Sequence, residues 1–397
     1  MTPAARIAAA AECLDRIAAG AAAEQVLTTW GRASRYAGSG DRAAVRDLVY
    51  QALRCRRSYG ARGGGGEVAT GRQLMLGLLR ARGEVPGDVF TGAGHAPAPL
   101  APAEAEAYAA APDAGSLPET VALDCPGWLE QPLREAMGAD FAGILAKMQT
   151  RAPVHLRVNL ARATRNEAMA ALAADGIAAR AHELASATLE AIENAGKIRA
   201  SKTYASGLVE LQDAASQAVC EALPLKPGDR VLDYCAGGGG KTLALAARVP
   251  GARYTAHDAL PQRMSDLPAR AARAGAEVRL ADTSEAEGGA PYDLVVADVP
   301  CSGSGTWARD PEAKWRLTPE RLAALQATQA EILNNAAILV AKGGHLAYLT
   351  CSLLRAENED AIAAFLEAHP AWRLASDRRI SPLAGGDGFY MALLTRG

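Results

Sequence analysis

Two cysteines lie in turns that suit a reactive thiol. Cys301 follows an apolar segment in DVPCSGSG, and Cys351 follows another in LTCSLLRAENE. Backbone N–H groups in a Gly/Ser-rich turn or at the start of a helix stabilise a thiolate, which is the nucleophilic form of the side chain. A thiolate that adds to an electrophilic carbon divides one difficult reaction into easier steps. The two segments therefore predict covalent catalysis by a thiol.

The other cysteines and the histidines indicate no metal or disulfide chemistry. The chain has seven cysteines and six histidines, without a C-x-x-C pair or a histidine cluster. Zinc sites and disulfide frameworks both depend on such grouping. We therefore expect no bound metal, and we expect buried structural thiols at Cys13, Cys55, Cys125 and Cys220.

A glycine-rich loop, DYCAGGGGKT over residues 233–242, suits a cofactor. A phosphate loop requires G-x-x-x-x-G-K-[ST], and Cys235 occupies the position of its first glycine. The dinucleotide pattern G-x-G-x-x-G fails as well, because Thr242 stands at its third glycine. The segment LVVAD, which ends at Asp298, still resembles the strand and acid that bind magnesium in nucleotide triphosphatases, so that class of enzyme stays an alternative.

Three aspartates follow successive predicted strands after this loop. Asp258 ends RYTAHD, Asp282 ends EVRLAD and Asp298 ends YDLVVAD. The carboxyl ends of parallel strands meet at one edge of a sheet, where open α/β folds bind ligands. There Asp258 suits ribose hydroxyls, and Asp282 suits an adenine amino group. A single aspartate is more often a helix cap or a turn residue, and that alternative stays open for each.

A thiolate beside an adenosine-type cofactor suits methylation of a pyrimidine carbon. C5 of cytosine is a poor nucleophile, but addition of a thiolate to C6 makes an enamine whose C5 accepts a methyl group. The adduct must then lose its C5 proton and release the enzyme, which gives a second thiol or another acid–base group a role. Asp298 is suited to contact the N3/N4 edge of the base.

These motifs occur in a recognisable order. The set VLDYCAGGGGKT, DVPCSGSGTWARDPEAKW and LTCSLLRAENED, with GLVELQDAASQ before it and DGFYMALLTR after it, closely resembles the RsmB/NOP/Sun family of S-adenosylmethionine-dependent RNA cytosine-C5 methyltransferases, bacterial 16S rRNA type. The resemblance covers residues 145–397. It implies that Cys351 is the nucleophile and that Cys301 assists product release. It also implies cofactor contacts from Cys235, Ala236, Gly237, Gly238, Gly239, Gly240, Lys241, Asp258, Asp282 and Asp298.

One part of the loop departs from the family pattern. The family usually has Cys-Ala-Ala-Pro-Gly-Gly-Lys, whereas Gly237 and Gly238 replace the second alanine and the proline here. Each glycine adds backbone freedom, at a folding cost of about 0.5–1 kcal/mol. We expect a loop that still accepts the cofactor but is less pre-organised.

Three predicted domains position these residues. Residues 206–397 alternate strands and helices, which indicates an α/β Rossmann-like domain and, by resemblance, a class I S-adenosylmethionine-dependent methyltransferase catalytic domain. Residues 140–205 contain the strand PVHLRVNLA and the helix NEAMAALAADGI, and resemble the small α+β module that contacts RNA in the family. Residues 1–139 have helical periodicity, and DRAAVRDLVYQALRCRR resembles the NusB-like RNA-binding domain of the 16S rRNA enzymes. Residues 60–68 and 92–115, rich in glycine or in proline and alanine, are expected to form loops.

The N-terminal end is basic. Residues 1–62 contain ten arginines and five acidic residues, whereas the whole chain has a net charge of -2. An excess of positive charge suits a phosphate-rich partner, and a solvated helical surface has the same composition. TWARDPEAKW adds Trp307, Arg309, Lys314 and Trp315 as expected RNA contacts, with packing of the tryptophans under the loop as the alternative.

Composition is that of a soluble globular protein. Of the 397 residues, 49% are hydrophobic and 22% are charged, and Glu12 and Asp15 interrupt the N-terminal segment where a signal peptide is apolar. We expect a cytoplasmic monomer that binds no membrane and methylates 16S rRNA. A tRNA substrate stays an alternative, as does a non-catalytic RNA-binding assembly factor that has kept the fold.

Overall fold

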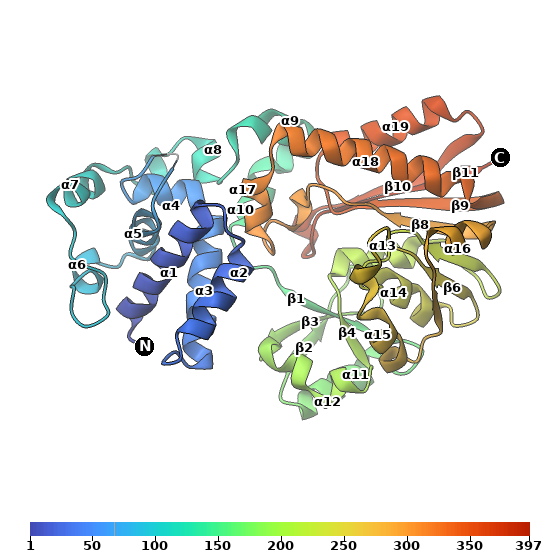
Figure 1. Ribbon diagram of the computed structural model, residues 1–397, viewed down its shortest axis with the longest axis horizontal. Coiled ribbons are helices and arrows are strands. Elements are labelled where there is room, and N and C mark those ends of the chain that lie inside the picture. The colour runs from blue at the N-terminus through green and yellow to red at the C-terminus, as the bar shows by residue number, and fades with distance from the viewer. Residues whose placement is uncertain (67) are drawn as a thin grey trace. The chain divides into compact units, whose positions relative to one another are not determined.

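The computed structural model describes residues 1–66 and 68–397, which form two compact units (Figure 1). The first comprises Met1–Arg151 and Trp307–Arg316, and the second comprises Ala152–Thr306 and Leu317–Gly397. The first unit is therefore discontinuous in sequence. Glu67, in the predicted loop 60–68, lies outside the described residues.

Helices make up all the regular structure described in the first unit, which confirms the predicted helical character of the N-terminal region. Thr2 and Thr70 cap α1 and α5, because their hydroxyls accept hydrogen bonds from N–H groups of the first turn. The bounds are α1 Pro3–Ala18, α2 Ala23–Ala33, α3 Ser39–Arg54, α4 Arg56–Arg62, α5 Gly71–Arg82, α6 Pro86–Val89, α7 Pro102–Ala110, α8 Glu119–Ala122, α9 Glu130–Met137, α10 Phe141–Met148 and α17 Pro311–Arg316.

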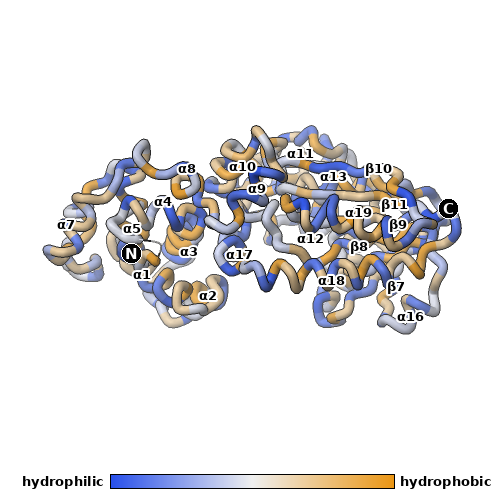
Figure 2. The backbone as a smooth tube through the Cα atoms, turned by 90° about the horizontal axis from the view of Figure 1, so that it is seen from above, coloured by the Kyte–Doolittle hydropathy of each residue, from blue (hydrophilic) through white to orange (hydrophobic). Residues whose placement is uncertain are grey.

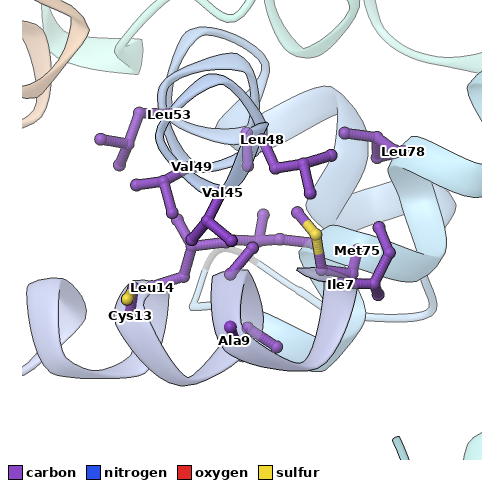
Figure 3. Close-up of a cluster of buried hydrophobic side chains, with 14 of the residues drawn as sticks. Ile7, Ala9, Cys13, Leu14, Val45, Leu48, Val49, Leu53, Met75 and Leu78 are labelled. Atoms are coloured by element: carbon purple, nitrogen blue, oxygen red, sulfur yellow. The ribbon is translucent and has the colours of Figure 1, made fainter. Parts of the chain in front are cut away.

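The apolar faces of α1, α3 and α5 form the core of this unit. Figure 3 shows Ile7 of α1, Val45 of α3 and Met75 of α5 in one cluster of buried side chains. Apolar residues three or four positions apart lie on one side of a helix, so each helix buries one face. Gly77 permits close packing of α5 on α4, since a Cβ atom there would lie 1.9 Å from the carbonyl oxygen of Tyr59.

Two segments that the sequence predicted as loops contain helix. α4 extends to Arg62, into the predicted break at residues 60–68. α7 lies within the predicted loop 92–115, because Pro102 occupies its first turn and AEAEAYAA is rich in helix-forming residues. Glycine and proline content alone was therefore a poor guide to the ends of these helices.

The segment Trp307–Arg316 packs into the helical unit through its own side chains. Trp307 is fully buried and Lys314 is 2% exposed. Lys314 Nζ donates to the carbonyl oxygen of Arg54 at 3.1 Å, and Trp315 Nε1 donates to that of Leu53 at 2.6 Å. The expectation that Trp307 and Lys314 contact RNA is therefore wrong, and the alternative of packing under the loop holds.

The second unit begins with a small antiparallel sheet of order β2-β3-β1-β4. The strands are β1 Val154–Val158, β2 Ala178–Ala181, β3 Thr188–Glu193 and β4 Val209–Leu211, with helices α11 Arg165–Ala174 and α12 Lys202–Ala205. Leu156, Leu172 and Leu189 meet in its core. Thr164 caps α11 by accepting a hydrogen bond from Glu167 N. The predicted strand in PVHLRVNLA and the predicted helix in NEAMAALAADGI are both confirmed.

A seven-stranded mixed sheet forms the larger part of the second unit. Its strands are β5 Arg230–Asp233, β6 Arg253–Ala256, β7 Val278–Leu280, β8 Tyr292–Asp298, β9 Val340–Thr350, β10 Trp372–Ile380 and β11 Phe389–Arg396, in the order β10-β11-β9-β8-β5-β6-β7. β5 to β9 are parallel, whereas β11 is antiparallel to β9 and β10 is antiparallel to β11. The predicted α/β Rossmann-like class is confirmed, and the sheet is antiparallel at the edge formed by β11 and β10.

Helices cover both faces of this sheet. Those nearest to it are α13 Ala214–Ala222, α14 Gly240–Arg248, α15 Leu267–Ala274, α16 Thr283–Gly288, α18 Pro319–Ile338 and α19 Glu359–Ala368. α18 and α19 pack on one face, and α13 and α14 pack on the other (Figure 1). Figure 2 shows hydrophobic and hydrophilic residues alternating along α18, as expected for a helix with one buried side. Among the helices in the described part of the chain, none has the length and hydrophobicity needed to span a bilayer.

Candidate active site

The carboxyl ends of β8 and β9 bring the two cysteine segments together. Asp298 lies opposite Leu349 in the pairing of these parallel strands, so the loops that follow start side by side. Sγ of Cys301 and Sγ of Cys351 are 3.4 Å apart. Gly305 N donates to the carbonyl oxygen of Cys351 at 2.8 Å, which adds a backbone link between the loops. The two thiols therefore occupy one site.

Contact with Cys301 affects the ionisation of the Cys351 thiol. The hydrogen bond with Cys301 and the burial of the site raise the pKa of Cys351 well above the usual value for a thiol. The Asp298 carboxylate raises the pKa further, and the Lys241 ammonium opposes the rise. At neutral pH Cys351 is therefore protonated, and it becomes a nucleophile only when that proton is removed.

Removal of the Cys301 thiol is expected to lower the pKa of Cys351, because their hydrogen bond is the largest cause of the increase. Thiolates react with iodoacetamide and thiols do not, so alkylation accelerates with pH up to the pKa. We expect the rate–pH curve of Cys301→Ala to lie at lower pH than that of the wild type. Mass spectrometry of the tryptic peptide 343–355, whose one cysteine is Cys351, measures the rate. If the rate–pH curves of the wild type and Cys301→Ala coincide, the Cys301 thiol does not raise the pKa of Cys351.

The glycine loop joins β5 to α14 and rests on two buried carboxylates. Asp233 Oδ2 accepts a hydrogen bond from Thr242 Oγ1 at 2.6 Å, and burial raises the pKa of Asp233 to about 6. Asp258 Oδ2 accepts from Gly237 N at 2.9 Å. Gly237 and Gly239 have left-handed backbone conformations with φ of 51° and 74°. Glycine is favoured at both positions because a Cβ atom is strained there.

Arg263 and Arg270, which no sequence motif singled out, cover this loop. Arg263 Nη1 lies 3.1 Å from Asp258 Oδ2, and Arg270 of α15 donates to the carbonyl oxygen of Gly238. A Cβ atom at Gly238 would lie 2.7 Å from Arg270 Nη1. The Arg270 guanidinium thus lies where the proline of the family pattern would extend, and it supplies a contact that restrains the loop.

Gly238→Pro is expected to destabilise the protein while Arg270 is present. Proline restricts the unfolded chain, which stabilises by about 0.4–1 kcal/mol, but displacement of the guanidinium costs about 1–3 kcal/mol as overpacking. In an Arg270→Ala background the clash is absent, so the same change becomes neutral or stabilising. Urea unfolding of the four proteins gives the coupling free energy. A value below about 0.5 kcal/mol would show that Arg270 does not take the place of the proline.

Lys241 connects the glycine loop to the end of β8. Its Nζ lies 2.5 Å from Asp298 Oδ2 and 5.0 Å from the centroid of the Phe389 ring. Burial lowers the pKa of Lys241, but the Asp298 carboxylate opposes this effect and the net result is a raised pKa. The nucleotide triphosphatase alternative assigns Lys241 to phosphate and Asp298 to magnesium. Here the two side chains form an ion pair with each other, and the triphosphatase alternative stays open.

The two remaining aspartates have partners within the protein. Asp282 is the N-cap of α16, where Oδ1 accepts from Glu285 N and from Ser284 Oγ at 2.9 Å each. These hydrogen bonds lower the pKa of Asp282. Asp258 is 4% exposed and also accepts from Leu260 N at 3.0 Å. The cap alternative therefore accounts for one oxygen of Asp282, and the adenine and ribose contacts stay predictions.

The loop and its neighbours fit a nucleoside-type cofactor. Glycines with left-handed φ let a backbone approach a ligand closely, and within the described residues the buried Oδ1 of Asp233 has no hydrogen-bond partner. Residues 235–241 and Asp258 are the groups that would hold such a cofactor. Among residues 1–66 and 68–397, no three His, Cys, Asp or Glu side chains are grouped to hold a metal ion.

Comparisons with known proteins agree with the order of the motifs. A family model described as 16S rRNA methyltransferase RsmB/F matches residues 220–394, and one described as an RsmF/B-like, ferredoxin-like domain matches residues 125–198. Ribosomal RNA small subunit methyltransferase B of Xanthomonas campestris pv. campestris is 33% identical over 296 residues. The match covers 68% of this chain and 66% of that protein, so the chain spans just under two thirds of the length of this curated relative.

Solved structures share the fold. The crystal structure of PH0851 superposes with a TM-score of 0.75 at 22% identity, over 100% of this chain and 99% of that one. The crystal structure of NSun6 from Pyrococcus horikoshii with SFG superposes with a TM-score of 0.61 at 16% identity, over 68% of this chain and 98% of that one. At these identities the likeness establishes a common fold.

Proposed function

Because the chain belongs to the RsmB/NOP/Sun family of methyltransferases, we propose that it transfers a methyl group from S-adenosylmethionine to C5 of a cytosine in RNA. The observation that best supports this proposal is the pair of thiols, with Cys301 Sγ and Cys351 Sγ 3.4 Å apart. Many covalent mechanisms need one thiol. Methylation at C5 needs a nucleophile that adds to C6 and also a group that helps to break the covalent adduct down. A pair of neighbouring thiols can supply both groups.

Cys351 is the nucleophile in this proposal. Its thiol loses a proton, and the thiolate forms a bond to C6 while the electron pair of the C5–C6 double bond makes C5 nucleophilic. After C5 has gained the methyl group, its proton must leave. The electron pair of the C5–H bond then re-forms the double bond and expels the Cys351 sulfur. We assign Cys301 to this release step and Asp298 to the N3/N4 edge of the base, with the Lys241 ion pair orienting the carboxylate.

The cofactor in this proposal is S-adenosylmethionine, which supplies an electrophilic methyl group on a sulfonium. We assign its binding to the backbone and side chains of residues 235–241, with Asp258 at the ribose, Asp282 at the adenine and Asp298 near the methyl group. Gly237 and Gly239, with φ of 51° and 74°, support this assignment because they bring the loop backbone close to a ligand. The related NSun6 structure was solved with SFG, which accords with a ligand in this fold.

The RNA substrate is proposed to be 16S rRNA. The name of the Xanthomonas relative specifies the small ribosomal subunit. We assign residues 1–139 to a NusB-like RNA-binding domain and residues 140–205 to a second RNA-contacting module, with residues 206–397 as the catalytic domain. The ten arginines within residues 1–62 support an RNA-binding role for the first of these. The protein is proposed to act as a cytoplasmic monomer.

Bisulfite sequencing of RNA from a strain that lacks the gene tests the substrate. We expect one 5-methylcytosine of 16S rRNA to disappear, and to return when the gene is restored. Loss of a methylcytosine from tRNA instead would establish the tRNA alternative. Calorimetric titration with S-adenosylmethionine and an ATPase assay complete the test. Unchanged RNA methylation together with no binding at millimolar cofactor would favour the assembly factor, and ATP hydrolysis would favour the triphosphatase.

A further inference from the structure

Glu357 is a buried carboxylate in the segment that follows Cys351. It belongs to LTCSLLRAENED, but no part of the chemistry above uses it. Its side chain has no solvent exposure, and it lies in the 3-10 turn Arg355–Glu357 before α19. An unpaired carboxylate at such a position would cost several kcal/mol, so its partners explain why it is tolerated.

Four hydrogen bonds converge on this carboxylate, and three of their donors come from other parts of the chain. Oε1 accepts from Ser302 N at 2.8 Å and from Gln329 Nε2 at 2.9 Å. Oε2 accepts from the hydroxyls of Ser302 and Ser352, at 2.5 Å each. Ser302 follows Cys301 and Ser352 follows Cys351, so one carboxylate holds the residue next to each thiol.

The surrounding groups extend this link. Gln329 of α18 also donates to the carbonyl oxygen of Pro300 at 2.9 Å, on the other side of Cys301. Ser304 Oγ accepts from Leu353 N at 2.8 Å, and Ser352 Oγ accepts from Leu354 N at 3.0 Å. Ser304 and Ser352 thus accept hydrogen bonds from backbone N–H groups. Their hydroxyls are hydrogen-bonded to each other, and Ser352 donates to the Glu357 carboxylate. A hydrogen-bonded network of this kind rigidifies what it joins.

The geometry points to Glu357 as a positioning residue that sets the separation of Cys301 and Cys351. A carboxylate with a local role would need donors from its own turn alone, whereas Ser302 lies 55 residues away in the sequence. Because two oxygens each accept two hydrogen bonds, an amide cannot replace the carboxylate without turning one acceptor into a donor. The meaning of this role for catalysis rests on the proposed function, but the role itself is a property of the folded protein.

Oxidation of the thiol pair measures this role without RNA or cofactor. Diamide, a diazene, takes up two protons and two electrons as two thiols become a disulfide. Tryptic peptides 280–309 and 343–355 each contain one cysteine, Cys301 and Cys351, so their cross-link is unambiguous by mass spectrometry. We expect rapid cross-linking in the wild type and a rate at least about 10-fold lower in Glu357→Gln, since small displacements of reacting atoms have large effects on rate.

Two further variants keep the test decisive. Ser302→Ala removes one donor from the neighbouring loop and leaves the carboxylate in place, so it carries the test if Glu357→Gln fails to fold. Glu367→Gln, an exposed change on α19, is the matched control and should cross-link at the wild-type rate. Thermal unfolding monitors the fold of each. Wild-type cross-linking in folded Glu357→Gln, or in Ser302→Ala if the former is unfolded, would overturn the inference.

Activity assays separate this inference from the proposed function. With RNA and S-adenosylmethionine, folded Glu357→Gln is expected to bind cofactor as the wild type does and to accumulate protein–RNA adduct, because release depends on the relation between the thiols. Slow cross-linking in a protein whose wild type methylates no RNA would leave the positioning role intact and refute the function. If the wild type methylates RNA but folded Glu357→Gln cross-links at the wild-type rate, the proposed function stands and the positioning role is refuted.

Discussion

Replacement of Cys351 by alanine is expected to abolish methyl transfer to RNA, to at least about 10³-fold below the wild type, as removal of a nucleophile typically does. Without the thiolate there is no C6 adduct, and C5 of cytosine stays too weak a nucleophile to accept the methyl group. Cofactor binding should be unchanged, because the assigned contacts lie in residues 235–241 and at the aspartates. Transfer of the radiolabelled methyl group from S-adenosylmethionine to 16S rRNA measures the loss.

Cys13→Ala is the matched control for this experiment. Cys13 is 1% exposed and packs in the core of the helical unit, whereas Cys301 and Cys351 belong to the other compact unit. Its replacement removes a buried thiol of similar size, so we expect lower thermal stability and nearly normal methyl transfer. Substantial transfer by a folded Cys351→Ala protein would refute the covalent mechanism and leave the fold unaffected.

Replacement of Cys301 by alanine is expected to have the opposite signature, namely a stable bond between protein and RNA. Cys351 can still add to C6 and C5 can still gain its methyl group, but the step that removes the C5 proton and expels Cys351 loses its assigned partner, 3.4 Å away. Adduct should therefore build up toward the amount of enzyme. A band of lower mobility in a denaturing gel, labelled by the RNA and sensitive to ribonuclease, measures it.

The double variant Cys301→Ala/Cys351→Ala tests the origin of that band. If the adduct forms through Cys351, the double variant shows none, because the carbon–sulfur bond cannot form. Rapid turnover without adduct in Cys301→Ala would mean that another group removes the C5 proton. A band that persists in the double variant would identify a different nucleophile.

The parts of the site that were predictable from sequence are those whose signals are local. The glycine loop, the aspartates and the cysteine turns each lie within a few residues of an apolar strand, so strand periodicity and turn composition were enough. The prediction that these segments meet at one edge of the sheet followed from the parallel order of the strands alone. The pairing of Asp298 with Leu349 confirms it for β8 and β9. The direction of β11 was not predictable in this way, because antiparallel and parallel strands have similar periodicity when both faces are buried.

Long-range partners account for most of what the sequence did not indicate. β10, WRLASDRRI, has six consecutive exposed residues as the edge strand, so it lacks the apolar alternation that marks a strand. Arg270 meets a carbonyl 32 residues away and Glu357 meets an amide 55 residues away. An arginine on a helix and a glutamate in a turn are ordinary in composition, and only the folded chain distinguishes them from solvated neighbours.

The discontinuous first unit has a practical consequence for dissecting the protein. No single cut in the chain separates the helical unit from the rest, because Trp307–Arg316 comes from between the two cysteine motifs. A fragment that starts at Ala152 would retain Trp307 and Lys314 but lose the helices around them, including the Arg54 carbonyl that Lys314 contacts. Such a fragment exposes a tryptophan that is buried in the whole chain and invites aggregation. Truncations intended to assign tasks to each unit must therefore also replace the apolar side chains of this segment.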